Sequence, residues 1–262
     1  MKFLRIFILF FFVTNLMASG SYSFSLINMQ MDYREFDANG NILDSEKANS
    51  IFGWEIGYTF NLNCDLKRYS SIVLKASEFS GYANYEGSEL ISGNPTVSST
   101  YENVYDISLA YLEKRKLENF GILYGLEGGY HSWYRELSSN QNELYYWFYA
   151  APTIGISKEI YKNFDIKLLL KYKYALNPKM KANSFSDDFK LGTTSTIELS
   201  IPFIYKYNNQ VNIFTEYVIS QQNIAKSNFV SGYIDGKYYN TIYEPDSTAN
   251  NQYIKFGFTF KY

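Results

Sequence analysis

The single histidine of this 262-residue chain is followed directly by a serine, and a histidine that activates a serine hydroxyl is a common hydrolytic arrangement. The histidine takes the hydroxyl proton only when both side chains lie on the same side of the backbone. His131 and Ser132 stand in a segment of alternating character, and successive side chains of a strand point to opposite faces. The next residue on the same face as His131 is two positions later, where a serine could be activated, but Trp133 occupies that position. The spacing argues against an acyl-transfer site and predicts that His131 is a hydrogen-bonded interior residue.

The sequence offers little for a metal site or a cofactor. With one histidine and one cysteine, Cys64, a histidine-based metal site and a disulfide framework are both excluded. Residues 37–46 space oxygen ligands as a calcium loop does, but Ile42 stands where that loop requires glycine. Asn39-Gly40 instead indicates a type I′ turn within a hairpin. We expect neither a metal nor a cofactor.

Alternation between apolar and polar residues runs through most of the chain. Aromatic residues make up 19% of it, and the mean hydropathy is −0.26, which is too polar for a bundle of membrane helices. Between Phe52 and Leu62, every second residue is apolar and the others are glycine, acid, amide or threonine. Comparable patterns predict about ten strands, with eight or twelve as alternatives. Several of these patterns span about ten residues, the length that a tilted strand needs to cross a bilayer.

The N-terminus is typical of an export signal. Lys2 and Arg5 precede an apolar run over residues 6–13, and Ala18-Ser19-Gly20 supplies small residues for cleavage after Ala18 or Gly20. The run is too short for a membrane-spanning helix. We therefore expect a signal peptide over residues 1–20 and one domain over residues 21–262. Cys64 is expected to be a lone thiol in a turn.

The C-terminus carries a resemblance to a known class of proteins. Its alternate residues are apolar or aromatic up to the last one: Ile254, Phe256, Phe258, Phe260 and Tyr262. This ending resembles the signal of bacterial outer-membrane β-barrel proteins, although that signal prefers a terminal phenylalanine. The resemblance implies export to the outer membrane of a Gram-negative bacterium and recognition of the last strand by the barrel-assembly machinery. It also implies contact with outer-membrane lipid and lipopolysaccharide.

Short polar turns alternate with longer connections along the predicted strands, as in outer-membrane barrels with short periplasmic turns and long extracellular loops. The expected fold is all-β, a closed antiparallel transmembrane barrel. Ten strands also resemble omptins, but the residue two before His131 is Gly129, so the omptin Asp-x-His pair is missing. The His-x-Ser arrangement of barrel lipid hydrolases is missing as well.

The polar face of the predicted strands collects charge. Its phase places nine ionisable residues in the lumen: Glu55, Asp106, Glu127, His131, Lys167, Lys171, Lys173, Glu198 and Glu216. Lys255 and Lys261 share this face on the last strand. Buried charges must pair or remain hydrated, and Lys171 with Glu198 is a plausible cross-strand pair. One interpretation is a salt-bridged plug, and the other is a small water-filled path.

The leading hypothesis is a non-enzymatic outer-membrane protein with a mostly side-chain-filled lumen and surface loops for envelope structure or contact. The alternative is a narrow porin-like channel for ions or small solutes, and the third is a membrane-embedded hydrolase. The near-neutral net charge of −2 argues against nucleic acid as a partner. The sequence does not identify a surface ligand.

Overall fold

The computed structural model describes residues 19–64, 67–88, 94–138, 141–183, 185, 187–234 and 237–262. Its strands are β1 (Gly20–Phe36), β2 (Ile42–Cys64), β3 (Arg68–Ser88), β4 (Pro95–Lys116), β5 (Gly121–Ser138), β6 (Gln141–Tyr161), β7 (Phe164–Ala182), β8 (Phe189–Lys190), β9 (Thr194–Lys206), β10 (Val211–Ile224), β11 (Val230–Ile234), β12 (Lys237–Ile242) and β13 (Asp246–Lys261). Within these ranges we find no helix that is long and apolar enough to cross a membrane. The predicted signal peptide lies outside the described residues up to position 18, as does the side chain of Cys64.

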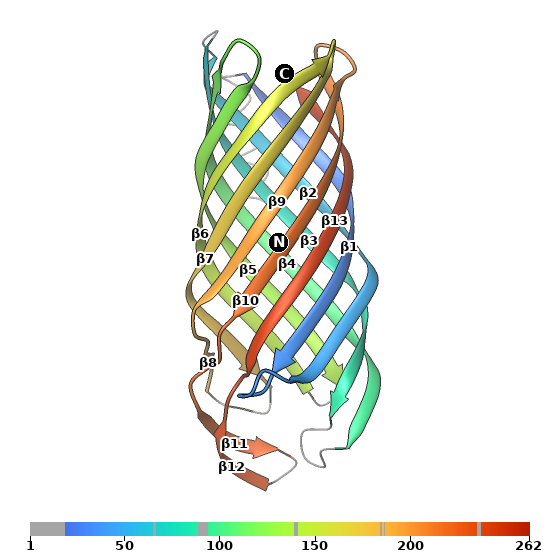
Figure 1. Cartoon of the computed structure of the whole chain (residues 1–262), viewed down its shortest axis with the longest axis vertical. Coiled ribbons are helices and arrows are strands. Elements are labelled where there is room, and N and C mark those ends of the chain that lie inside the picture. Colours follow the sequence, from blue (N-terminus) through green and yellow to red (C-terminus); the bar gives the residue numbers. More distant parts are fainter. Residues whose placement is uncertain are drawn as a thin grey trace, which may run out of the picture.

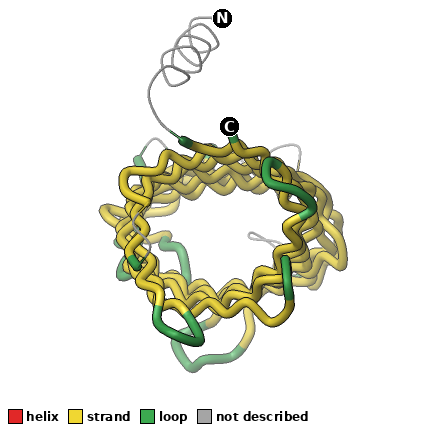
Figure 2. The backbone as a smooth tube through the Cα atoms, turned by 90° about the horizontal axis from the view of Figure 1, so that it is seen from above, coloured by secondary structure: helices red, strands yellow, loops and turns green. Residues whose placement is uncertain are grey.

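Ten of these strands close into an antiparallel barrel, which confirms the predicted fold class (Figures 1 and 2). The order is β6-β5-β4-β3-β2-β1-β13-β10-β9-β7, and pairing of β6 with β7 completes the ring. β1 pairs with β13, so that Ser21 lies beside Lys261 at the end of the barrel that holds the short turns. The two-residue β8 and the β11–β12 hairpin lie at the opposite end, which we call the loop end.

The strands are longer than predicted. β2 has 23 residues and β4 has 22, where the alternation predicted about ten. Part of the expected loop over residues 86–100 therefore belongs to β3 and β4, and residues 89–93 lie outside the described residues. The expected long loop after β5 is reduced to residues 139–140. β2 and β4 are therefore about twice as long as the roughly ten residues that suffice to cross a bilayer.

The hairpin predicted at Asn39-Gly40 exists, but its turn type was wrong. A type I′ turn needs positive φ at both central residues, and only Gly40 has it, at 82°. The carboxylate of Asp37 instead accepts the backbone N–H groups of Asn39 and Asn41, each at 2.8 Å, and closes a five-residue loop. These bonds occupy the carboxylate that a calcium loop would use. The second predicted hairpin is confirmed as β11–β12, although its turn, Asp235-Gly236, lies outside the described residues.

Gly257 lies on the inward face of β13, where β13 meets β1 and closes the barrel. A Cβ atom there would come within 2.2 Å of the backbone oxygen of Phe24, which cannot move independently of β1. We expect Gly257→Ala to lower the free energy of unfolding by about 1–3 kcal/mol, as overpacking generally does. Denaturant titration followed by tryptophan fluorescence measures this. Gly128→Ala is the matched control, because its nearest neighbour would lie 3.9 Å away. Equal losses from both variants would contradict the prediction.

Candidate functional site

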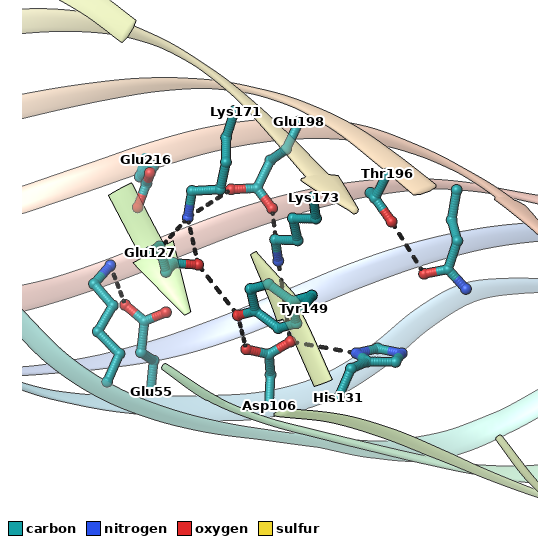
Figure 3. A network of polar contacts seen from close by, with 12 residues as sticks. Glu55, Asp106, Glu127, His131, Tyr149, Lys171, Lys173, Thr196, Glu198 and Glu216 are labelled. Atoms are coloured by element: carbon teal, nitrogen blue, oxygen red, sulfur yellow. Dashed lines mark hydrogen bonds and ion pairs between the residues drawn. The ribbon is translucent and has the colours of Figure 1, made fainter. Parts of the chain in front are cut away.

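The inward side chains of the central barrel enclose a cavity of about 230 Å³. All nine residues that the sequence placed in the lumen line it, together with two further lysines. Figure 3 labels all of the nine except Lys167. We call the eleven ionisable side chains the lumen network: Glu55, Lys75, Asp106, Glu127, His131, Lys167, Lys171, Lys173, Glu198, Glu216 and Lys255. Lys75 was not among the predicted lumen charges, although it lines the cavity. Lys261 does not line the cavity.

On one side of the network, Glu55 lies between two lysines. Its carboxylate accepts Lys75 Nζ at 3.2 Å and Lys255 Nζ at 2.9 Å. Lys255 also lies 3.7 Å from the carboxylate of Glu216. These contacts join β2, β3, β10 and β13, so a single ion-pair chain crosses the β1–β13 seam from the inside.

On the other side, two lysines of β7 face three carboxylates. Lys171 Nζ lies 2.9 Å from Glu127 and 3.7 Å from Glu198, so the predicted Lys171–Glu198 contact exists, but Glu127 is the nearer partner. Lys173 Nζ lies 3.3 Å from Glu198 and 4.0 Å from Asp106. The alternation of sign along this row lets each lysine bridge two acids, which offsets the desolvation cost of burying it.

His131 lies among polar and aromatic side chains. Its Nδ1 is 3.3 Å from Asp106, and its ring stacks on Trp147 with centroids 4.7 Å apart. Tyr149 donates its hydroxyl to Asp106 at 2.8 Å and faces Glu127 at 3.1 Å (Figure 3). Among the hydrogen bonds of the described residues, none joins a serine or threonine hydroxyl to His131, and Ser132 lies on the outward face. This arrangement orients a histidine but supplies no nucleophile to it.

The network is balanced in charge. It contains five carboxylates and five lysines, and every member of the ten except Lys167 has an ion-pair partner among the described residues. A lumen with equal numbers of both signs exerts little net field on a passing ion. The described residues also contain no group of three His, Cys, Asp or Glu side chains placed to hold a metal ion.

A second cluster of buried ionisable and aromatic side chains lies on the loop side of the cavity, and the sequence did not predict it. Its centre is Arg135 of β5, whose side chain is 1% exposed. We call the cluster the Arg135 layer: Tyr33, Glu35, Glu46, Glu102, Trp133, Arg135, Glu143, Tyr145 and Glu244. These residues continue the inward alternation of their strands, with two exceptions. Glu46 lies beyond an irregularity of β2 between Lys47 and Phe52, and Glu244 follows β12. Extending the period past the expected strand ends would have found most of them.

Arg135 makes ion pairs to three strands. Its guanidinium lies 3.1 Å from Glu46 on β2, 3.3 Å from Glu35 on β1 and 2.9 Å from Glu143 on the neighbouring β6. Since β1 and β5 are separated by three strands in the barrel wall, the pair to Glu35 spans the lumen. The Arg135 guanidinium also lies over the ring of Tyr33, 4.4 Å from its centroid.

Aromatic rings and a loop segment complete the layer. Trp133 packs edge-on against Tyr33 and stacks on Tyr145, at centroid distances of 5.0 Å and 5.2 Å, and its Nε1 donates to Glu102 at 2.6 Å. Tyr145 donates its hydroxyl to Glu244, which ties the segment after the β11–β12 hairpin to the barrel wall. The layer therefore links β1, β2, β4, β5 and β6 to the segment after β12 on the loop side of the cavity.

Comparison of the sequence with protein families and with curated proteins finds no match. Among solved structures, the chain is similar to the translocator domain of the autotransporter NalP from Neisseria meningitidis, with a TM-score of 0.43, 8% identity, and coverage of 95% of this chain and 90% of that chain. It is also similar to the COG4313 outer membrane channel from Pseudomonas putida F1, with a TM-score of 0.41, 6% identity, and coverage of 94% and 97%. A third similar structure is Neisserial surface protein A, with a TM-score of 0.33, 9% identity, and coverage of 92% of this chain and 97% of that chain. With TM-scores this low, nothing about function is transferred from them.

The Arg135 layer lies beyond the apolar part of the outer surface. On β1 it is flanked outside by the Asp32–Arg34 ion pair, 2.7 Å long. Arg34 pairs across the strands with Thr248, six residues closer to the loop end than Ile254, the last outward apolar residue of β13. On β1 and β13 the layer therefore lies outside the segment that could contact a bilayer core.

Burial and mutual repulsion raise the pKa values of the glutamates in the Arg135 layer. Burial raises the pKa of Glu35 to about 7, although Arg135 opposes the change. The pKa of Glu102 is raised well above its usual range by burial and by Glu46, and burial with Glu35 does the same for Glu244. The pKa of Glu143 is raised by burial. Five carboxylates around one guanidinium cannot all be ionised at low cost, so part of this layer holds protons near neutral pH.

Proposed function

We propose that this chain is an outer-membrane barrel with a closed lumen that works, without catalysis, through the surface at its loop end. The support for a membrane position is an outward belt of exposed apolar side chains on nearly every strand of the barrel. Examples are Leu26, Phe52, Leu109, Leu126, Ile154, Leu170, Ile197, Ile219 and Phe256. An exposed apolar surface that encircles a barrel favours contact with lipid, because its contact with water is unfavourable in free energy. The alternating C-terminal residues 254–262 remain our proposed assembly signal.

The observation that carries the closed lumen is the Arg135 layer. Arg135, Tyr33 and Tyr145 are each at most 1% exposed, and they lie in the path along the barrel axis. Met29 and Met31, also buried, pack below them at the top of the cavity. A ten-stranded barrel is narrow enough for such side chains to fill its cross-section, unlike the barrels of 16–18 strands that form open porins.

The loop end offers the surface for contact. Beyond the belt, exposed aromatic side chains stand on the extended walls and on the β11–β12 hairpin, among them Tyr82, Phe229, Tyr233 and Tyr238. Lys226 lies over the ring of Tyr243, 4.5 Å from its centroid, and Phe229 packs edge-on against the same ring. Aromatic and basic groups held together on an extended wall favour contact with a surface partner.

The second candidate function is a narrow channel, and the cavity favours it. A charged cavity of about 230 Å³ inside a membrane barrel can hold water and a small ion. For conduction, the Arg135 layer would have to open.

Planar-bilayer recording separates these functions. We expect the wild-type protein to insert without steady unitary currents. Replacing both Trp133 and Met31 with alanine should produce currents, because it removes two side chains from the closing section while leaving the lumen network in place. Phe148→Ala, on the lipid-facing side, is the control and should remain silent. Steady wild-type currents that change with Lys171→Ala or Glu198→Ala would overturn the closed-lumen proposal in favour of the channel.

A further inference from the structure

An acidic side chain on the outward face of the barrel is almost completely covered. Glu113 of β4 points outward, as do Tyr111 and Arg115 on the same strand, yet its side chain is only 3% exposed. Two arginines and two tyrosines cover it. A buried carboxylate on this face would be costly without partners. The covering groups offset that cost, because they pair with its charge and donate hydrogen bonds to it.

Glu113 holds the two arginines in fixed positions. Arg68 Nη2 donates to one carboxylate oxygen at 2.7 Å, and Arg115 Nε donates to the other at 3.3 Å. Tyr111 donates its hydroxyl to Glu113 at 3.1 Å, and Tyr124 donates to it from β5. The arginines thus come from adjacent strands and share one anchor.

The arginines retain binding capacity. A guanidinium carries five N–H donors, and the recorded bonds to Glu113 use one from each arginine. Their side chains are 54% and 60% exposed. Two cations with one anion leave an excess positive charge, and the exposed Lys67 and Lys116 lie next to them, joined by a backbone hydrogen bond. A second anion is therefore favoured beside Glu113.

The position of this group points to a lipid. Arg68 begins β3 and Arg115 is the penultimate residue of β4, both at the short-turn end of the barrel. On the loop side they are followed by outward apolar residues of the belt, including Leu109 and Leu126, with Tyr111 at the boundary. Short turns lie on the periplasmic side of outer-membrane barrels, so this is the level of the headgroups in the periplasmic leaflet. Phosphate is the anion at that level, and a pair of guanidinium forks matches it.

We propose that Arg68 and Arg115, held by Glu113, bind the phosphate of an anionic phospholipid in the periplasmic leaflet. The inference rests on the proposed membrane position of the barrel. The acyl chains of the lipid would lie along the belt beside Leu109 and Leu126, and the tyrosines would border its headgroup. An anionic headgroup is favoured over a zwitterionic one, because the site carries excess positive charge and each basic group near a membrane surface adds to the attraction.

Native mass spectrometry of the full protein, released from nanodiscs of equimolar phosphatidylglycerol and phosphatidylcholine, tests this. We expect wild-type protein to retain one phosphatidylglycerol in preference to phosphatidylcholine. Arg68→Gln with Arg115→Gln should reduce that preference about tenfold, since two basic contacts are lost. The single variant Arg68→Gln should give a smaller reduction and covers the case in which the double variant does not fold. Arg34→Gln, which removes an exposed arginine paired with Asp32 at the loop end, is the matched control and should retain the preference.

Three results would overturn the inference. Wild-type protein that retains no anionic lipid, or a double variant that retains it fully, would make Glu113 only a clamp between strands. Loss of bound lipid in the presence of millimolar inorganic phosphate would make the ligand a free phosphate. Heat-modifiable migration on gels and insertion into nanodiscs are measured in parallel. If the protein inserts but retains no lipid, the result contradicts this inference alone. If the protein does not insert, the result contradicts the proposed function.

Discussion

Replacing Arg135 with methionine is expected to lower the free energy of unfolding by about 3–5 kcal/mol, the usual loss when one partner of a buried ion pair is removed. Arg135 has three glutamate partners, Glu35, Glu46 and Glu143, and lies in the most buried part of the lumen. Methionine fills much of the volume but leaves these carboxylates without their shared cation. The expected loss of stability therefore comes from buried carboxylates without a cationic partner, and not from a cavity.

Guanidinium chloride titration of the detergent-folded barrel measures this loss, with tryptophan fluorescence as the signal because Trp133 belongs to the layer. Arg34→Met is the matched control, and we expect it to change the free energy of unfolding by less than about 1 kcal/mol, as exposed ion pairs do. The Arg135→Met variant should also recover part of its stability at pH 5, where the glutamates take up protons. A loss below 1 kcal/mol at pH 8 would show that the layer is not held by this arginine.

Much of the barrel could be predicted from the sequence, because one face of each strand contacts a different environment from the other. The alternation from Phe52 to Leu62 predicted both the strand and the inward position of Glu55, which lines the cavity. The same phase placed Lys171 and Glu198 on facing strands, where they are register partners. Period two is a local property, so reading it required no knowledge of distant contacts.

The Arg135 layer could not be found in this way, for two physical reasons. The predicted strands were ended where a bilayer would end, while the structure continues them as a wall in water, where outward polar residues such as Asp32 and Arg34 weaken the contrast between faces. The layer also depends on contacts between distant segments: Tyr145 and Glu244 are 99 residues apart. No local pattern indicates that the segment after a surface hairpin folds back into the lumen.

The second large effect concerns pH. In the folded barrel the pKa of Glu35 is raised to about 7 from an ordinary value of 4.5. Between these values the folded state keeps a proton that the unfolded state has released, so this group contributes stability below about pH 4.5 and loses it as the pH rises to about 7. The shift corresponds to a loss on the order of 3 kcal/mol. Glu102, Glu143 and Glu244 act in the same direction, because their pKa values are also raised.

Glu35→Gln isolates the contribution of Glu35, because the amide stays neutral at every pH and its oxygen can still accept from Tyr33. We expect the free energy of unfolding of wild type, relative to this variant, to fall by roughly 3 kcal/mol between pH 4.5 and pH 8. Glu136→Gln is the control for replacing a glutamate of β5 by glutamine, since the neighbouring Glu136 is exposed on the other face of this strand. A wild-type difference that stays flat, or that grows with pH, would mean that Arg135 keeps Glu35 ionised. The Arg135 layer would then close the lumen as a fully charged cluster rather than as one that holds protons.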